Sequence, residues 1–564
     1  MSRFVRPSKY RHVYGTAARK EDFYDNIKVS NNAWDTNLVA GNGRFVSVNW
    51  AASGGGAFAL IPVARTGKLP DIYPLCRGHS ASVLDTAFSP FDDAFVASAS
   101  DDGTVGLWRA NEEDWSVLDL SEKEREKAGG VKDLQPLRKL HGGGRKVGQV
   151  LFHPVANHVL AAATGDHVIK LYDVEAGGDG AQVEMTGFSD SIQSLAFDWT
   201  GTTLVATCRD RKLRTFDTRK GGKAVQEAES HGGIKGARVA WCGQLDRFIT
   251  TGFSKMSDRQ LFLWDSTNIS KPLKQIVLDS SSGVIMPFWS DNNICFLAGK
   301  GDGNIRYYEL ENDELHYLTE YKSTEPQRGL TFVPRRALNA DENEIARAYK
   351  VTGNMVQPIS FLVPRRAESF QSDIFPPAPS SKPALSAAEF FAGKTAQPNL
   401  VSLEDGSGVK SSGAAPSAAS AGAPRSAPAP ASAPAATASF ASAPSNSTSA
   451  AAAPAPASAA AAPAAQPAPA PAPKAPEPAT QQRAASPQKS TFAALRENGH
   501  AASAAAASAP ASAAAASGAG DAEARKELEK LKRQLAERDA RIRELEVENE
   551  RLRTNQQRVR EALM

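Results

Sequence analysis

The sequence predicts an all-β fold, a seven-bladed WD-repeat β-propeller, followed by a packed extension, a disordered linker and a C-terminal parallel α-helical coiled coil. The main observation is a repeat in which an aspartate precedes an aromatic residue by six positions. Successive aspartates lie 64, 44, 48 and 44 residues apart, and a period in the mid-forties is typical of four-stranded blades. The five pairs are Asp102 and Trp108, Asp166 and Tyr172, Asp210 and Phe216, Asp258 and Trp264, and Asp302 and Tyr308.

The best preserved copy of the repeat combines His79, Ser100, Asp102 and Trp108. Aspartate tolerates the tight turn between the second and third strands of a blade and accepts a hydrogen bond from a histidine. We therefore predict a buried relay, a chain of hydrogen bonds that joins the imidazole, the carboxylate, the hydroxyl and the indole of these four residues.

The same residue types can form a hydrolytic triad, which is the alternative interpretation of this copy. An enzyme needs a catalytic triad only once in its chain, whereas this set of residues recurs, with substitutions, in a second copy of the repeat. We therefore favour a structural role and predict no enzyme activity. The second copy consists of His141, Thr164, Asp166 and Tyr172.

The N-terminal arm is basic, and its segment Lys9–Tyr14 alternates well enough to predict a strand. A strand that precedes the first blade needs a partner. Pairing with the last blade would close the ring and remove exposed edges.

The first blade is expected from about Asn37, with strands at 44–50 and 57–63 but without the aspartate and tryptophan. A charged insertion, Asn111–Pro136, accounts for the longest interval and should project as a loop or short helix. Segments 330–334, 345–351 and 358–364 supply the last strands, so that residues 1–365 form the propeller with the N-terminal strand completing it.

Two segments of contrasting composition follow the propeller. Residues 366–405 carry apolar side chains such as Phe370, Phe375 and Phe390, so we expect an extension packed on the propeller. Residues 406–520 are almost entirely Ala, Pro, Ser and Gly, which offer no apolar surface to offset the entropy of ordering, and a disordered linker is predicted.

Residues 521–564 form a heptad repeat that predicts a self-associating coiled coil. Asn549 at an a position favours a dimer, whereas Arg at g with Glu at e resembles the trimerisation motif of short coiled coils. The trimer is favoured and the dimer stays open. The residues assigned to oligomerisation are Leu528, Leu531, Leu535, Arg541, Ile542, Leu545, Glu546, Leu552 and Val559.

Composition narrows the classes of partner and site. A formal net charge of +3 argues against a general nucleic-acid binder. No signal-peptide core and no run of about eighteen apolar residues is present, so no membrane insertion is expected. The cysteines, Cys76, Cys208, Cys242 and Cys295, form no metal-ligand pairs, so we predict free thiols in a reducing cytosol, no metal and no cofactor.

Several blocks outside the repeats resemble the coronin family, and they occur in order across nearly the whole chain outside the linker. They include Ser8–Gly15, the Phe23–Ser30 block with Trp34-Asp35, the VPRRALNADENEIARAYKVT block, the SDIFPP block and the short terminal coiled coil. The long Ala/Pro/Ser linker is similar to that of fungal coronins.

The resemblance implies binding of actin filaments (F-actin) by the propeller, engagement of the branched-actin nucleating complex by the coiled-coil end, and a role in actin network assembly and turnover. It also implies a location in the cytoplasm and cytoskeleton, at cortical actin patches and in endocytosis. The family's actin-contacting basic residue maps to Lys28, where lysine keeps the charge but lacks the two-pronged geometry of arginine. Weaker candidates in the basic arm are Arg6, Lys9, Arg11, Arg19 and Lys20.

Self-association of the tail would convert modest propeller affinity into avidity and cross-link filaments. The competing hypothesis is a WD-repeat scaffold of another pathway, such as a vesicle-trafficking or ubiquitin-ligase adaptor. Sedimentation with actin filaments separates the two hypotheses.

Overall fold

A computed structural model describes residues 6–409 except 54, 367 and 368, together with the single residues 529, 532, 533, 536 and 540. The chain divides into two units, residues 1–431 and 432–564, and the first contains the propeller. The heptad seam and the linker beyond residue 409 lie outside the described residues. Within the described part, no helix is long and apolar enough to cross a membrane.

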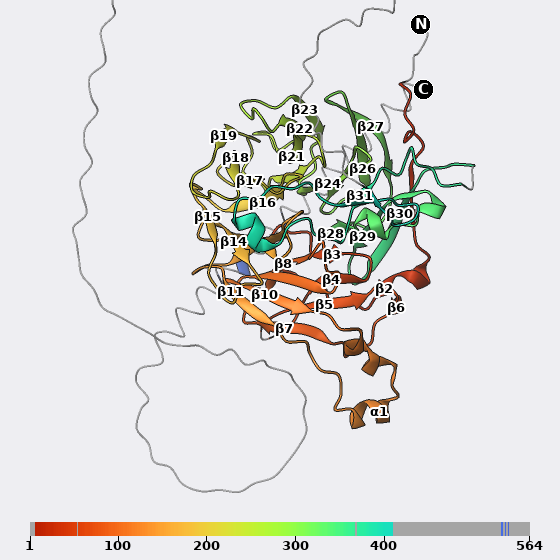
Figure 1. Cartoon of the computed structure of the whole chain (residues 1–564). Helices are drawn as coiled ribbons and strands as arrows, with labels where there is room; N and C mark the ends of the chain where they lie inside the picture. The colour runs from red at the N-terminus through yellow and green to blue at the C-terminus, as the bar shows by residue number, and fades with distance from the viewer. Residues whose placement is uncertain are drawn as a thin grey trace, which may run out of the picture. The chain divides into compact units, whose positions relative to one another are not determined.

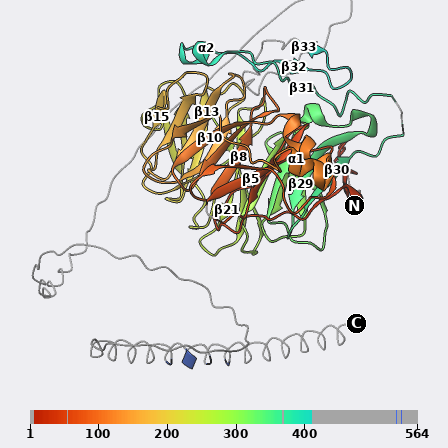
Figure 2. The same cartoon turned by 90° about the horizontal axis from the view of Figure 1, so that it is seen from below.

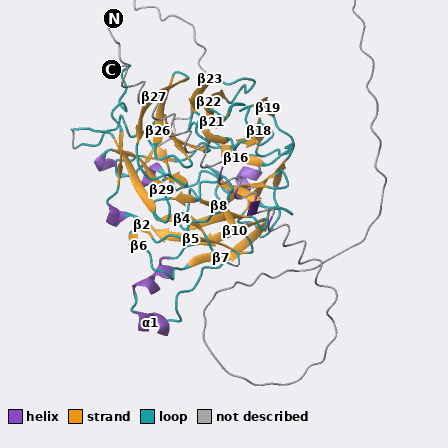
Figure 3. Ribbon diagram, turned by 180° about the vertical axis from the view of Figure 1, so that it is seen from behind, coloured by secondary structure: helices purple, strands orange, loops and turns teal. Residues whose placement is uncertain are grey.

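Seven sheets surround a central channel, six of them with four antiparallel strands each (Figure 1). Figure 1 shows the first strand of each blade toward the middle and the fourth at the rim, as a propeller requires. The predicted β-propeller is therefore confirmed. Almost all the regular structure of the ring is strand (Figure 3).

The strands of the first three blades follow the chain. The first blade contains β3 (Val39–Gly41), β4 (Phe45–Trp50), β5 (Gly56–Pro62) and β7 (Leu75–His79). The second contains β8 (Val83–Phe88), β9 (Phe95–Ser100), β10 (Thr104–Arg109) and β11 (Arg138–His141). The third contains β12 (Val147–Phe152), β13 (Val159–Thr164), β14 (Ile169–Asp173) and β15 (Val183–Met185).

The next three blades repeat this order. The fourth contains β16 (Ile192–Phe197), β17 (Thr203–Cys208), β18 (Lys212–Asp217) and β19 (Gln226–Glu229). The fifth contains β20 (Arg238–Trp241), β21 (Arg247–Phe253), β22 (Arg259–Asp265) and β23 (Lys274–Asp279). The sixth contains β24 (Ile285–Ser290), β25 (Ile294–Gly299), β26 (Ile305–Glu311) and β27 (Glu314–Tyr321).

The seventh blade joins the two ends of the propeller. It contains β28 (Gly329–Phe332), β29 (Glu344–Val351) and β30 (Val356–Leu362), with 3-10 turns η3 (Arg335–Ala337) and η4 (Ala340–Glu342) between β28 and β29. The N-terminal strand β1 (Tyr14–Ala17) pairs antiparallel with β30, opposite Ile359–Leu362. After η1 (Lys20–Asp22), β2 (Tyr24–Asp25) pairs with β30 and with β6 (Gly67–Lys68).

The N-terminal strand begins at Tyr14, so the prediction of a strand at Lys9–Tyr14 is wrong in its bounds. The buried residues of that segment are Tyr10 and Val13, three positions apart, and the Val13 N–H donates to the Tyr10 carbonyl at 3.1 Å. A spacing of three with this hydrogen bond is a turn, whereas a strand buries alternate residues.

The insertion between β10 and β11 of the second blade forms a 3-10 segment, η2 (Glu112–Asp119), and a short helix, α1 (Glu122–Lys127), which projects from the rim in Figure 1. Trp115 anchors the insertion because its ring is buried against Phe45 of β4, with centroids 5.4 Å apart.

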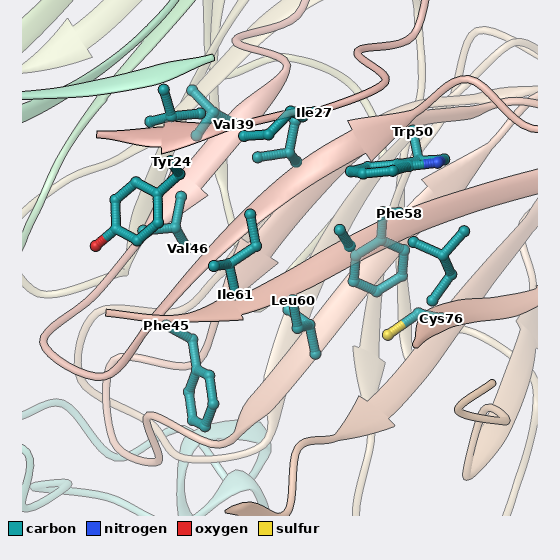
Figure 4. Close-up of a cluster of buried hydrophobic side chains, with 14 of the residues drawn as sticks. Tyr24, Ile27, Val39, Phe45, Val46, Trp50, Phe58, Leu60, Ile61 and Cys76 are labelled. Carbon is teal, nitrogen blue, oxygen red and sulfur yellow. The ribbon is translucent and has the colours of Figure 1, made fainter. Parts of the chain in front are cut away.

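The core of the ring lies between neighbouring sheets. Figure 4 shows one such cluster, in which Tyr24 and Ile27 of the N-terminal segment lie with Val39 and Val46 of the first blade. The strands β4, β9 and β13 are buried at every position, which is expected for strands with a sheet on either side. All four cysteines are buried with free thiols.

Polar side chains connect the innermost strands of successive blades. Asp85 Oδ2, Gln149 Oε1 and Gln193 Oε1 each accept a backbone N–H from the next blade, at 3.2, 2.9 and 2.9 Å. The donors are Val150, Leu195 and Ala237. These contacts satisfy buried N–H groups that the sheets leave unpaired and hold neighbouring blades in register.

Residues 364–409 lie along one face of the ring (Figure 2) and include β31 (Ala378–Pro379), α2 (Ala387–Phe391), β32 (Leu400–Val401) and β33 (Gly408–Val409). Residues of this segment contact the turns that connect the first and second strands of the blades. Arg335 Nη2 donates to the Pro376 carbonyl at 2.7 Å, and the Phe390 ring lies 4.4 Å from that of His153. We call this side the extension face. The opposite side carries the turns between second and third strands and is called the turn face.

Candidate functional site

Lys28 lies on the turn face. The Ala51 N–H donates to the Lys28 carbonyl at 2.6 Å, and Val29 pairs with Trp50 at the end of β4. These contacts place Lys28 beside the turn between β4 and β5. Its neighbours Ile27 and Val29 are buried, so the alternation of the extended backbone turns the exposed Lys28 side chain outward. Within the described residues, Lys28 forms no ion pair.

The chain from Ser30 to Asn37 then crosses the mouth of the central channel on the turn face. We call residues 30–37 the plug segment. Trp34 Nε1 donates to the Gly148 carbonyl at 2.9 Å, Arg328 Nη2 donates to the Ser30 carbonyl at 2.6 Å, and Thr36 Oγ1 donates to the Leu84 carbonyl. Contacts with several blades therefore fix the segment that follows Lys28.

The structure does not bring the other basic-arm candidates to Lys28. Arg6 pairs with Glu309 and Glu311, and Lys9 Nζ donates to the Asp373 carbonyl. Both residues precede β1 and lie toward the extension face, whereas Lys28 lies on the turn face. The basic arm is therefore not one continuous surface.

The remaining arm candidates lie on either side of β1, with Arg11 before the strand and Arg19 and Lys20 after it. Arg19, before η1, is exposed and pairs with Asp22 at 3.1 Å, while Lys20 is exposed and Arg11 is half-buried. Lys20, like Lys28, forms no ion pair among the described residues, whereas Lys28 is the one that its backbone contacts place beside the turn between β4 and β5.

The relay in the second blade uses Ser98 in place of the predicted Ser100. His79 Nδ1 lies 3.0 Å from Asp102 Oδ2, and His79 Nε2 lies 2.7 Å from Ser98 Oγ. Trp108 Nε1 donates to the same Ser98 oxygen at 2.7 Å. Ser100 Oγ donates instead to the Ala81 carbonyl at 3.0 Å. The assignment of Ser100 to the relay is therefore wrong.

Gly106 explains the choice of Ser98. Gly106 lies opposite Ser98 in the pairing of β9 with β10. A Cβ at Gly106 would lie 2.7 Å from Trp108 Nε1, 2.8 Å from Ser98 Oγ and 3.0 Å from His79 Nε2. The absent side chain leaves the space in which the three polar groups meet.

The relay also sets the ionisation of Asp102. Burial of the carboxyl opposes ionisation, but hydrogen bonds from His79 and Thr104 outweigh it and hold the pKa of Asp102 below its usual value. The aspartate is therefore a charged acceptor that fixes the turn, and the Ser98 hydroxyl at the other end of the relay is fully buried.

The fifth blade repeats part of this relay. His231 Nε2 lies 2.9 Å from Thr250 Oγ1, which accepts a hydrogen bond from Trp264 Nε1 at 2.8 Å. Asp258 is eight residues after Thr250, whereas Asp102 is four after Ser98, and the longer turn carries the carboxylate away from the histidine. Asp258 accepts a hydrogen bond from Ser254 Oγ at 2.9 Å.

The predicted second copy in the third blade forms no relay. His141 is exposed and contributes only its carbonyl, to the Tyr172 hydroxyl at 2.9 Å, while Thr164 Oγ1 donates to the Val168 carbonyl. Asp166 accepts the Gly144 N–H at 2.8 Å.

The remaining two repeat aspartates, Asp210 and Asp302, pair with arginines. Asp210 pairs with Arg214 at 2.7 Å, and Asp302 pairs with Arg259 at 2.8 Å. All five repeat aspartates therefore serve the architecture of turns and blades.

Three family models match parts of the chain. A domain of unknown function, DUF1899, matches residues 3–68, a WD domain (G-beta repeat) matches residues 72–109, and a type of WD40 repeat matches residues 356–398. The first of these includes Lys28 and the plug segment.

Curated relatives match about the same part of the chain. Coronin-like protein crn1 of Schizosaccharomyces pombe is 52% identical over 404 residues, 71% of this chain and 65% of the relative. Coronin-like protein of Saccharomyces cerevisiae is 50% identical, covering 71% and 61%. The chain thus spans less than two thirds of these two relatives. Coronin-A of Dictyostelium discoideum is 45% identical, covering 72% of this chain and 87% of the relative.

A solved structure has the same fold. The crystal structure of the WD40 domain from Toxoplasma gondii coronin is 28% identical, has a TM-score of 0.63, and covers 70% of this chain and 97% of that domain.

Proposed function

Because the chain belongs to the coronin family, we propose that it binds actin filaments through the turn face of its propeller and thereby regulates the assembly and turnover of actin networks. The observation that carries this proposal is the exposed Lys28, held outward between buried Ile27 and Val29. A rigidly presented cation suits an acidic filament surface by electrostatic complementarity.

The fixed backbone geometry around Lys28 supports its proposed role in filament binding. The plug segment behind it is anchored to several blades, so that little conformational entropy is lost when a partner binds. Lysine contacts an acidic group as a point charge, and its replacement by arginine would add a second donor.

Sedimentation with actin filaments tests this function. The full chain should sediment with filaments, Lys28→Asp should bind at least about tenfold more weakly, and Lys28→Arg should bind at least as tightly as the wild type. Lys123→Asp, on the exposed side of the α1 insertion, is the matched charge reversal and should not change binding. Absence of wild-type binding would refute the proposed function.

The C-terminal heptads supply the second part of the proposal. Self-association through residues 521–564, as a trimer or a dimer, would link several propellers and cross-link filaments by avidity. We also assign engagement of the branched-actin nucleating complex to this end of the chain, and a location in the cytoplasm at cortical actin patches, where endocytosis takes place.

A further inference from the structure

A second feature of the turn face is a cavity beside the plug segment. It lies between Trp34 and Asp35 on one side and the beginnings of β16 and β20 on the other, with a volume of about 260 Å³. We call it the channel-mouth pocket. Residues from distant parts of the chain build it, because the plug segment crosses the channel there.

The walls of the pocket carry more positive than negative charge. Arg209, Lys235 and Arg238 line it, and Asp35 supplies the one carboxylate among its lining residues. That carboxylate already has a partner, since Lys300 Nζ lies 3.5 Å from Asp35 Oδ1. An anion entering the pocket would therefore meet a lining with a net positive charge.

Arg238 is the most unusual of these cations because it is buried, with 6% of its surface exposed. Its Nη2 donates to the Asp35 carbonyl, but its Nε has no hydrogen-bond partner among the described residues. Burial lowers the pKa of Arg238, with Asp35 and Asp85 acting against that shift. A buried guanidinium with unused donors is costly, and an anionic ligand would offset that cost.

The rim of the pocket adds an apolar component. Ile234, which lines the pocket, is exposed to 68%, and Met256, which lies outside the lining in the neighbouring loop, is exposed to 84%. The Gly233 N–H donates to the Phe253 carbonyl at 2.8 Å, which holds the two rim loops together. A small inorganic anion would leave this apolar rim unused.

We propose that the channel-mouth pocket binds an acidic peptide segment of a protein partner, with a carboxylate side chain directed at Arg238 and an adjacent aliphatic side chain on Ile234. Arg209 and Lys235 flank the entrance and contribute to attraction of the acidic segment. This site requires no actin filament, so its test is separate from that of the proposed function.

Fluorescence anisotropy of the full chain with a labelled, blocked peptide of the sequence Glu-Glu-Asp-Leu-Glu-Glu tests the proposal. Binding should be saturable and weaken with salt, and Arg209→Glu should lower the affinity about tenfold or more. Arg209 is exposed, so this variant leaves the core intact. Arg209→Lys should retain most of the affinity, and Lys123→Glu on α1 should retain all of it.

Two further probes identify the ligand chemistry. A peptide with glutamine and asparagine in place of the acidic residues should not bind, and one with serine for leucine should bind several-fold more weakly, as should Ile234→Ser with the original peptide. Equal affinity of the wild type and Arg209→Glu would overturn the proposal. Displacement of the peptide by inorganic phosphate at equal concentration would also overturn it, because the pocket would then be a phosphate site.

Discussion

Ser98 is the residue on which the second blade depends. Its hydroxyl contacts both His79 and Trp108, whereas the Ser100 hydroxyl donates to the Ala81 carbonyl. Removing Ser98 would leave two buried polar groups without their partner, and each unsatisfied group costs about 1–3 kcal/mol.

Ser98→Ala should therefore lower the free energy of unfolding by about 2–4 kcal/mol, and Ser100→Ala by about 1 kcal/mol. Urea unfolding of the two variants beside the wild type measures both values. Equal losses, or a larger loss for Ser100→Ala, would contradict the relay described for this blade.

The sequence predicted the histidine, aspartate and tryptophan of this relay but not its hydroxyl. Ser98 and Ser100 are two positions apart in β9 and therefore point to the same side of the strand. The choice between them depends on Gly106 in the neighbouring strand, a contact that the repeat pattern does not contain.

Asp85 is a buried titratable group whose ionisation should make the stability of the propeller depend on pH. Burial raises the pKa of Asp85 to about 7, while its hydrogen bond from Val150 and the charges of Arg238 and Lys300 oppose that rise. Between the usual carboxyl pKa of about 4 and this value, the folded protein binds more protons than the unfolded chain. The contribution of Asp85 to stability therefore falls as the pH rises through this window.

Asp85→Asn keeps an acceptor for the Val150 N–H but removes the titration. The stability of the variant relative to the wild type should rise between pH 4 and pH 7, by up to about 1.4 kcal/mol per pH unit, and should then level off. Urea unfolding at several pH values measures this difference. A difference that is independent of pH would show that the carboxyl is not buried as described.

The extension is the element that the composition predicted least specifically. Its phenylalanines indicated packing, but not the face of the propeller on which they pack. His153 provides the contact point: its Nδ1 accepts the Val155 and Ala156 N–H groups, its Nε2 lies 3.1 Å from the Gly201 carbonyl, and its ring lies against Phe390.

Phe390→Ala should lower the free energy of unfolding by about 3 kcal/mol, because the ring is fully buried in the cluster beneath α2. Phe391→Ala is the matched control and should cost less, since that ring is half-buried. Amide hydrogen exchange should show faster exchange of residues 384–394 in Phe390→Ala. Unchanged exchange there would argue against docking of α2 through this residue.

At the scale of the whole molecule, the repeat period was sufficient to predict the ring of blades. The plug segment was not predicted, because its contacts join residues far apart in the chain, such as Trp34 with Gly148 and Ser30 with Arg328. In the sequence, Trp34 and Asp35 are distinguished only by the family resemblance to which they belong. The repeat pattern thus predicted the blades and the need of an N-terminal strand for a partner in the last blade, but it contains no signal for contacts across the middle of the ring.

Filament cross-linking is a property of the whole chain. The full chain should bundle actin filaments, and a chain ending at Gly520 should still bind filaments but should bundle them much less, because its propellers are no longer linked. Low-speed and high-speed sedimentation separate bundling from binding. Equal bundling by the two chains would contradict the role assigned to the heptads.

The central claim is that the turn face carrying Lys28 contacts the actin filament. Amide hydrogen exchange of the full chain, alone and saturated with filaments, tests it most directly. We predict slower exchange in residues 26–36 and in the turn-face loops, with no change in residues 376–401 of the extension. Protection confined to the extension, or none on either face, would contradict the account.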